Sequence, residues 1–323
     1  MRATLRVAIT VVAAASALTI GACSASEITP TAHSVDAGPA QPGSGAAPTP
    51  STATSATATP GTAYFLVVTA TSVQIKALRS GRLSVAASIA KGANECVWNS
   101  TSVAPDGIHI AWIEPTGELG AIGSLRVADI NGSHPRTLAT NVICADPKAT
   151  SWDGSSRVVV RTRTELFTVN ISSGERTELG GLVHVAFSAD GHTIAQQVGR
   201  AVTVGPVGGH GTAVHYTPPA AEAPRWDGWQ TYSVARDGRM ISVNWNGTDP
   251  SRRDHTFAVV RVSDGATIAL PHAGVDHVEF LANGNVFALR GRVYDVLDSH
   301  LRVLTTSTLP SSLTTFQPLR YVP

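Results

Sequence analysis

Two segments close together in the chain concentrate residue types that proteins use for recognition. The segments "APRWDGWQ" (223–230) and "NWNGTDPSRRDH" (244–255) contain three tryptophans and several arginines. Aromatic rings beside guanidinium groups suit the binding of proteins or glycans, because they combine apolar contact area with directed hydrogen bonds. We predict that the binding residues here are Trp226, Asp227, Trp229, Trp245, Arg252 and Arg253. The alternative is that one or two of these tryptophans only pack inside the fold.

Two histidines form a second candidate group. His184 and His277 each stand six residues before a recurring turn motif, and Asp276 precedes the second histidine. With Asp146, such side chains could hold a metal; alternatively, the histidines only hydrogen-bond to backbone or water. We adopt the second interpretation and predict no metal, while His277 and Asp276 stay as minor binding residues. The chain lacks a Gly-x-Ser-x-Gly elbow, a His-Glu-x-x-His motif and a phosphate loop, so no catalytic residue and no cofactor are predicted.

The N-terminal residues have the pattern of an export signal. Arg2 and Arg6 precede an uncharged stretch, which ends in Ile20-Gly21-Ala22-Cys23. This ending resembles the lipobox of bacterial lipoproteins, and the resemblance implies cleavage after residue 22 and acylation of Cys23. We therefore expect a lipid anchor on the extracytoplasmic face of the cell membrane. The alternative is an ordinary signal peptide with a chance cysteine.

Residues 23–60 are predicted to form a disordered tether. They consist mainly of Ala, Pro, Ser, Thr and Gly and contain almost no large apolar side chain. Removing residues 1–22 changes the formal charge from +1 to −1, because two arginines and no acid are lost. A nearly neutral chain excludes nucleic acid as a partner. The scarcity of lysine and the abundance of alanine and glycine favour a GC-rich, actinobacterial genome.

A turn motif recurs through the rest of the chain. "SVAPDGIHIAW", "SWDGSSRVVV", "AFSADGHTIA", "SVARDGRMISV" and "FLANGNVFAL" each place Asp-Gly or Asn-Gly between two apolar stretches. The motifs begin at residues 106, 153, 190, 237 and 283, at intervals of 37 to 47 residues. Each interval holds four short strand patterns and no convincing helical period. Four-stranded units at this spacing predict the blades of a β-propeller, in which glycine takes a positive φ and Asp caps the turn.

The two ends of the repeat region complete one another. Residues 64–88 contain three strand patterns without the one that precedes the turn motif, and "LTTFQPLRYVP" remains after the last unit. We predict that this C-terminal segment supplies the inner strand of the first blade and closes the ring. The predicted fold is all-β, a six-bladed propeller over residues 61–323.

The motifs "SVAPDGIHIAW" and "AFSADGHTIA" resemble the WD40-like repeat of TolB-type propellers. The resemblance covers residues 61–323 and implies the six-bladed fold. "SWDGSSRVVV" departs from the pattern because it lacks proline, and "LANGNVF" departs because it replaces Asp with Asn. TolB has an extra α/β domain before its propeller, and here the tether occupies that place. Its partner, a peptidoglycan-associated lipoprotein, is not carried over.

Two cysteines occupy nearly equivalent points of neighbouring blades. Cys96 lies ten residues before Asp106, and Cys144 lies nine before Asp153. Inner strands of adjacent blades are close near the axis, and an exported protein meets oxidising conditions. We predict a Cys96–Cys144 disulfide; the alternative is two buried thiols.

In a propeller, loops leading into the inner strands and loops joining second to third strands lie on the same face. The segments 223–230 and 244–255 are loops of these two kinds, so their tryptophans and arginines should meet on one rim. The predicted function is a membrane-anchored lipoprotein whose propeller binds an envelope protein or glycan. The alternatives are a six-bladed lactonase- or lyase-type enzyme with a metal-assisted site at the channel mouth, and a purely structural envelope component.

Overall fold

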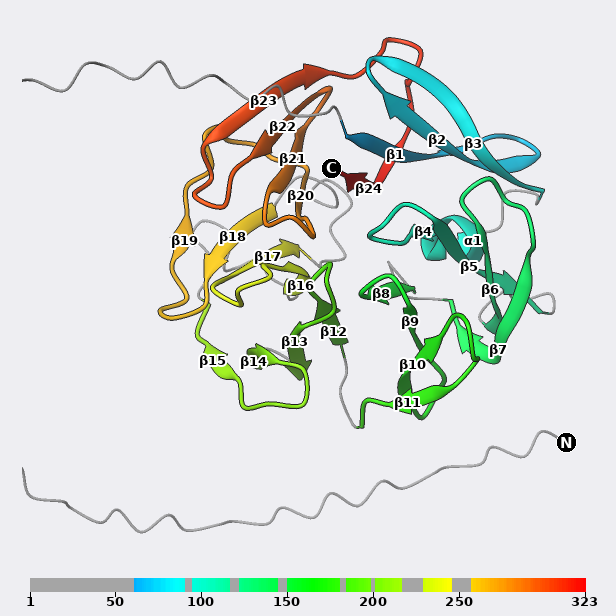
Figure 1. Ribbon diagram of the computed structural model, residues 1–323, viewed down its shortest axis with the longest axis horizontal. Helices are drawn as coiled ribbons and strands as arrows, with labels where there is room; N and C mark the ends of the chain where they lie inside the picture. The colour runs from blue at the N-terminus through cyan, green and yellow to red at the C-terminus, as the bar shows by residue number, and fades with distance from the viewer. Residues whose placement is uncertain are drawn as a thin grey trace, which may run out of the picture. The chain divides into compact units, whose positions relative to one another are not determined.

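The computed structural model describes residues 61–90, 95–116, 122–144, 150–180, 184–198, 201–216, 229–245 and 257–323. These residues form six four-stranded antiparallel sheets, which Figure 1 shows arranged around a common centre. The prediction of an all-β, six-bladed propeller is confirmed. The described part of the chain contains no helix that is long and apolar enough to cross a membrane.

Each sheet is one blade, and its four strands are given from the centre outward. Blade 1 consists of β24 (Gln317–Val322), β1 (Thr62–Val68), β2 (Ser72–Arg79) and β3 (Arg82–Ala90). Blade 2 consists of β4 (Ser102–Val103), β5 (His109–Pro115), β6 (Ile122–Asp129) and β7 (Arg136–Ile143). Blade 3 consists of β8 (Ser151–Asp153), β9 (Arg157–Arg161), β10 (Leu166–Asn170) and β11 (Arg176–Glu178).

The remaining three blades follow in chain order. Blade 4 consists of β12 (His184–Phe187), β13 (Thr193–Val198), β14 (Ala201–Pro206) and β15 (Thr212–Val214). Blade 5 consists of β16 (Trp229–Val234), β17 (Met240–Trp245), β18 (Phe257–Arg261) and β19 (Thr267–Ile268). Blade 6 consists of β20 (His277–Phe280), β21 (Val286–Arg290), β22 (Val293–Leu297) and β23 (Val303–Thr308).

The C-terminal strand closes the ring as predicted. β24 pairs with β1 in antiparallel register, with Thr62 opposite Val322, and is the innermost strand of blade 1. The chain therefore ends near the centre of the ring (Figure 1). Closure by the last strand places β1 and β24, the first and last described strands, in a single sheet, so that blade 1 has its full set of four strands.

The recurring turn motifs connect the first and second strands of blades 2 to 6. Gly107 has φ of 71°, and the Asp106 carboxylate accepts a hydrogen bond of 2.9 Å from the Ile108 N–H. Asp190, Asp237 and Asn283 accept the same bond from the residue two positions on. The prediction that glycine takes a positive φ and that the acidic residue caps the turn is thus confirmed.

One short helix was not predicted. α1 (Glu95–Ser100) lies before β4, and its six residues are too few to produce a recognisable helical period in the sequence. The Ser100 hydroxyl donates to the Cys96 carbonyl at 2.6 Å, and the Cys96–Cys144 disulfide joins this helix to the end of blade 2's outer strand. The predicted disulfide is therefore confirmed, and it links the segment before blade 2 to the segment after it.

The core consists of apolar side chains packed between neighbouring blades. We call each interface between two blades a seam. Six clusters of buried residues fill the six seams, with Phe65, Phe167 and Phe287 among their largest fully buried members. A blade has two apolar faces and cannot cover either alone, so stability depends on closing the ring.

The outer edges of the blades are poorly suited to pairing with another strand. β11, β15 and β19 contain only two or three residues. The longer outer strands β3, β7 and β23 each have a register irregularity in their pairing with the third strand of the blade. Short or bulged edges oppose strand addition, so we expect the faces of the ring, rather than its perimeter, to contact partners.

Candidate functional site

A polar cavity lies at the centre of the ring, where inner strands from five blades converge. Ser151 and Trp152 line it from blade 3, Phe187 from blade 4, Tyr232 from blade 5 and Glu279 from blade 6, and Arg320 of β24 completes it. Its volume is about 30 Å³. A space of this size holds water-sized groups, and a sugar or a lactone ring does not fit without movement of the blades.

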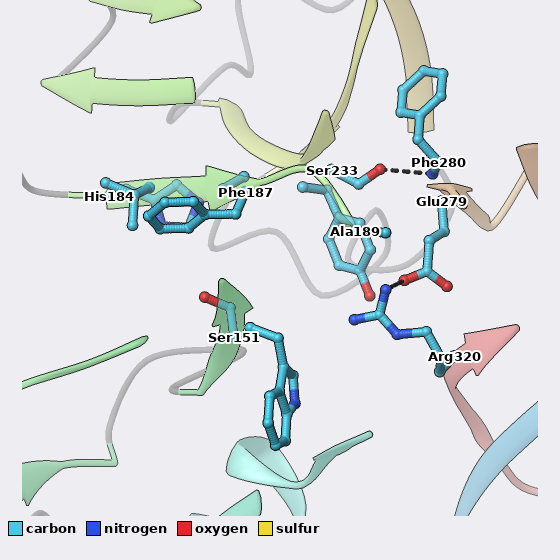
Figure 2. Close-up of a pocket in the computed structure, with 12 residues that line it drawn as sticks. Ser151, His184, Phe187, Ala189, Ser233, Glu279, Phe280 and Arg320 are labelled. Atoms are coloured by element: carbon cyan, nitrogen blue, oxygen red, sulfur yellow. Dashed lines mark hydrogen bonds and ion pairs between the residues drawn. The ribbon is translucent and has the colours of Figure 1, made fainter. Parts of the chain in front are cut away.

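An ion pair between Glu279 and Arg320 dominates this cavity. Figure 2 shows the guanidinium of Arg320 directed at the carboxylate of Glu279. Both side chains are largely removed from solvent, with exposed fractions of 4% for Glu279 and 13% for Arg320. The second Glu279 oxygen accepts a hydrogen bond of 3.3 Å from the Tyr321 N–H, and Arg320 Nε donates to the Val103 carbonyl at 3.2 Å. Arg320 thus links blades 6, 1 and 2.

Tyr232 lies next to this pair. Burial raises the pKa of its hydroxyl far above the usual range, the Glu279 charge raises it further, and the Arg320 charge opposes the rise. The phenol therefore stays protonated across physiological pH and acts only as a neutral polar group.

His184 joins blade 4 to blade 5. Its Nε2 lies 2.7 Å from the Thr231 carbonyl, and its Nδ1 lies 3.1 Å from the side-chain nitrogen of Gln230. A carbonyl can only accept, so Nε2 carries the proton and Nδ1 accepts from the amide. This matches the interpretation that the histidine hydrogen-bonds to backbone.

The inner strands of other blades are linked in the same manner. The Ser233 hydroxyl of blade 5 accepts a hydrogen bond of 2.8 Å from the Phe280 N–H of blade 6 (Figure 2). Between blades 2 and 3, Ser102 contacts Thr150 at 2.6 Å and accepts from Trp152 Nε1 at 3.1 Å. Most polar groups around the channel thus form a hydrogen bond with the backbone or a side chain of a neighbouring blade. Buried polar groups require such partners.

The chemistry that this arrangement permits is limited. Glu279 and Arg320 neutralise one another, and Tyr232 is held neutral, so these groups are arranged for holding strands together rather than for proton transfer. Within the ranges that the structure describes, no three His, Cys, Asp or Glu side chains come close enough to hold a metal ion. Asp146, considered above as a ligand, lies outside these ranges.

The predicted position of His277 at the channel mouth is wrong. Its side chain is 2% exposed and packs against Tyr232 and Phe257, with ring centroids 5.0 and 5.5 Å away, and against Phe287. Asp276 is half-buried and accepts a hydrogen bond from the Gly291 N–H, which caps the hairpin between β21 and β22. Neither residue faces an open site, because the inner strand turns His277 into the seam between blades 5 and 6.

Trp229, predicted to contact a partner on the rim, is buried instead. Its side chain is 4% exposed and meets Tyr216 edge to face at 5.1 Å, within the core between blades 4 and 5. Gln197 fixes the backbone here by donating to the Trp229 carbonyl at 2.6 Å. This tryptophan packs inside the fold, as the alternative interpretation of the sequence stated. Trp245 is the last residue of β17 and lies opposite Trp229 in the register.

The remaining predicted residues lie outside the described ranges: Cys23, Trp226, Asp227, Arg252 and Arg253. In contrast, the sequence analysis missed Glu279 and Arg320. A signal for them existed, since each is a charged residue inside an otherwise apolar inner-strand pattern, "HVEF" and "PLRYV". A charge at such a position needs a partner, although the pattern does not say which.

Comparison with known proteins supports the fold. No family model and no curated protein matches the sequence. The structure of TolB from Acinetobacter baumannii resembles this chain with a TM-score of 0.50 at 14% identity, over 81% of this chain. The match covers 65% of the TolB chain, so this chain spans about two thirds of it. A putative 6-phosphogluconolactonase from Bacteroides fragilis matches with a TM-score of 0.43 at 11% identity, over 85% of this chain and 100% of that one.

Proposed function

We propose that this chain, a six-bladed propeller whose fold resembles that of TolB, is an extracytoplasmic lipoprotein that binds an envelope protein or glycan on one face of its ring. The observation that carries the proposal is the state of the channel. An ion pair and hydrogen bonds between blades surround its central cavity, whose volume is about 30 Å³. A scaffold that recognises a partner with its surface fits this interior better than an enzyme with a substrate in the channel.

The disulfide supports an extracytoplasmic location. Structural disulfides persist outside the cytoplasm. Cys96 and Cys144 are both buried in the seam between blades 2 and 3. This agrees with the lipobox that ends in Cys23.

Replacing Cys23 with alanine is expected to release the protein from membranes. Thioether-linked acyl chains provide the durable attachment, and the cysteine is their only site in the lipobox. The measurement is fractionation of cells into membrane and soluble material, with Ser24→Ala as the matched control. If the Cys23→Ala protein stays in the membrane fraction as completely as the control, the lipoprotein part of the proposal is wrong.

The position of Gly61 indicates which face is available for binding. Gly61 lies against Val322, and Val322 lies against Gly107 in the first turn motif. Gly61 therefore lies on the face of the Asp-Gly turns. In a propeller with this strand order, segments that enter an inner strand, or that join the second strand to the third, are expected on the opposite face, and Trp226 and Arg252 belong to segments of these two kinds. We therefore propose that this opposite face binds the partner, through Trp226, Asp227, Trp245, Arg252 and Arg253.

Site-directed photo-crosslinking in living cells tests the binding face. A photoreactive phenylalanine analogue at Trp226 should yield a discrete crosslinked adduct, while the same group at Arg239 should not. Arg239 is a suitable control because its side chain is 84% exposed and lies on the face of the turns. Once the adduct is identified, Trp226→Ala or Arg252→Ala should weaken binding by about thirtyfold, as expected for a buried anchor. Adducts at Arg239 alone, or undiminished binding by both variants, would assign the interaction elsewhere.

A further inference from the structure

Among the described residues, the seam between blades 3 and 4 has the smallest cluster of buried apolar side chains. Its cluster contains five buried apolar residues, among them Val159, Val185 and Phe187. The clusters of the other five seams contain nine to fourteen such residues in the described part of the chain. Apolar burial supplies most of the attraction between blades, so this seam has the smallest share of it.

The inner strands at this seam also lack a direct polar link. Side chains join the inner strands of blades 2 and 3, 4 and 5, 5 and 6, and 6 and 1. Arg320 joins blade 1 to blade 2. Between the described residues of β8 and β12, no side-chain hydrogen bond crosses the seam.

A buried hydroxyl weakens the same seam. Thr168 of β10 is 1% exposed, and its Oγ1 has no hydrogen-bond partner. Thr168 stands opposite Val159 in the register, and Val159 belongs to the cluster of this seam, so both side chains point toward blade 4. A buried hydroxyl without a partner has lost its hydrogen bonds to water and has formed none within the protein. Its burial therefore costs free energy as long as the two blades are packed together.

The central cavity lies at the inner end of this seam. Ser151 and Trp152 of β8 form one wall, and Val185, Ala186 and Phe187 of β12 form the facing wall. Figure 2 shows Ser151 of β8 opposite His184 and Phe187 of β12. The cavity therefore borders this seam at the level of its inner strands.

We propose that the ring opens at the seam between blades 3 and 4. Among the described residues, opening there separates the smallest apolar cluster, breaks no side-chain hydrogen bond between β8 and β12 and lets water reach the Thr168 hydroxyl. The other five seams stay closed, so the motion is a local separation of two blades and not unfolding of the ring. The opening exposes Val185 and Phe187 and widens the channel, independently of which partner binds the rim.

Thiol labelling tests this with a matched pair, because blades 4 and 6 repeat the pattern His-Val-x-Phe in their inner strands. Val185 and Val278 occupy its second position, and both are buried. Each is changed to cysteine in the full chain carrying Cys23→Ser, so that the new thiol is the only one outside the disulfide. Without denaturant, Val185→Cys should react with an aromatic disulfide reagent at least about tenfold faster than Val278→Cys.

A second variant separates seam opening from damage caused by the cysteine. Adding Thr168→Val removes the unpaired hydroxyl at nearly constant volume, so it should slow labelling at Val185→Cys several-fold and leave Val278→Cys unchanged. Hydrogen exchange of the unmutated chain should show lower protection in β12 than in β20. Equal labelling rates, or equal protection of both strands, would overturn the proposal. No effect of Thr168→Val on the faster site would overturn the place assigned to the opening.

Discussion

Replacing Arg320 with alanine is expected to lower the free energy of unfolding by about 3–5 kcal/mol. The reason is that Glu279, whose side chain is 4% exposed, would be left in the centre of the ring without its counter-ion, and a buried carboxyl without a partner is costly whether it is charged or neutral. The variant also removes the hydrogen bond to the Val103 carbonyl, which ties blade 1 to blade 2. A small domain commonly has a total stability of about 5–15 kcal/mol, so the loss is a large part of it.

A double variant without either charge shows whether this effect belongs to the ion pair. Glu279→Gln together with Arg320→Met should be less destabilised than Arg320→Ala alone, because no uncompensated charge remains. Arg239→Ala is the control for loss of an arginine at an exposed position, where a change within about 0.5 kcal/mol is expected. Urea denaturation followed by tryptophan fluorescence measures all three. If Arg320→Ala is no less stable than the Arg239 control, the pair does not hold the ring closed.

Loss of the Cys96–Cys144 disulfide is expected to cost about 4 kcal/mol of stability in the chain-entropy model. The bond spans 48 residues, so it removes many conformations of that length from the unfolded chain. It also fixes α1 against blade 2, where Cys96 is 4% exposed and Cys144 is 2% exposed.

The test compares the oxidised chain with the double variant Cys96→Ala and Cys144→Ala. Alanine avoids placing a polar hydroxyl in a buried site, so the difference reports mainly the cross-link. Unmutated protein that is unfolded, reduced and refolded in reductant should show the same lower urea midpoint as the double variant. A midpoint equal to that of the oxidised chain in both samples would mean that the bond contributes nothing to stability.

The sequence by itself determined the architecture of this protein. A β-turn depends on a few adjacent residues, so each Asp-Gly or Asn-Gly pair between apolar stretches could be recognised locally, as Asp106-Gly107 illustrates. Recurrence of that signal determined the number of blades, and the unmatched strands at the two ends indicated closure by β24. The disulfide followed from the same counting, since Cys96 and Cys144 hold equivalent places in adjacent repeats.

Only the tertiary structure decided what the individual side chains do. Glu279 and Arg320 are 41 positions apart and meet because the ring closes between blades 6 and 1. Trp229 and His277 are polar-tipped rings at the starts of inner strands, and such rings suit a rim or a seam equally well. Which of the two they occupy depends on the register in which β16 and β20 pair with their neighbours, and a shift of one residue reverses the face. That register is set by the packing of whole blades against one another, an interaction between distant parts of the chain that no local pattern records.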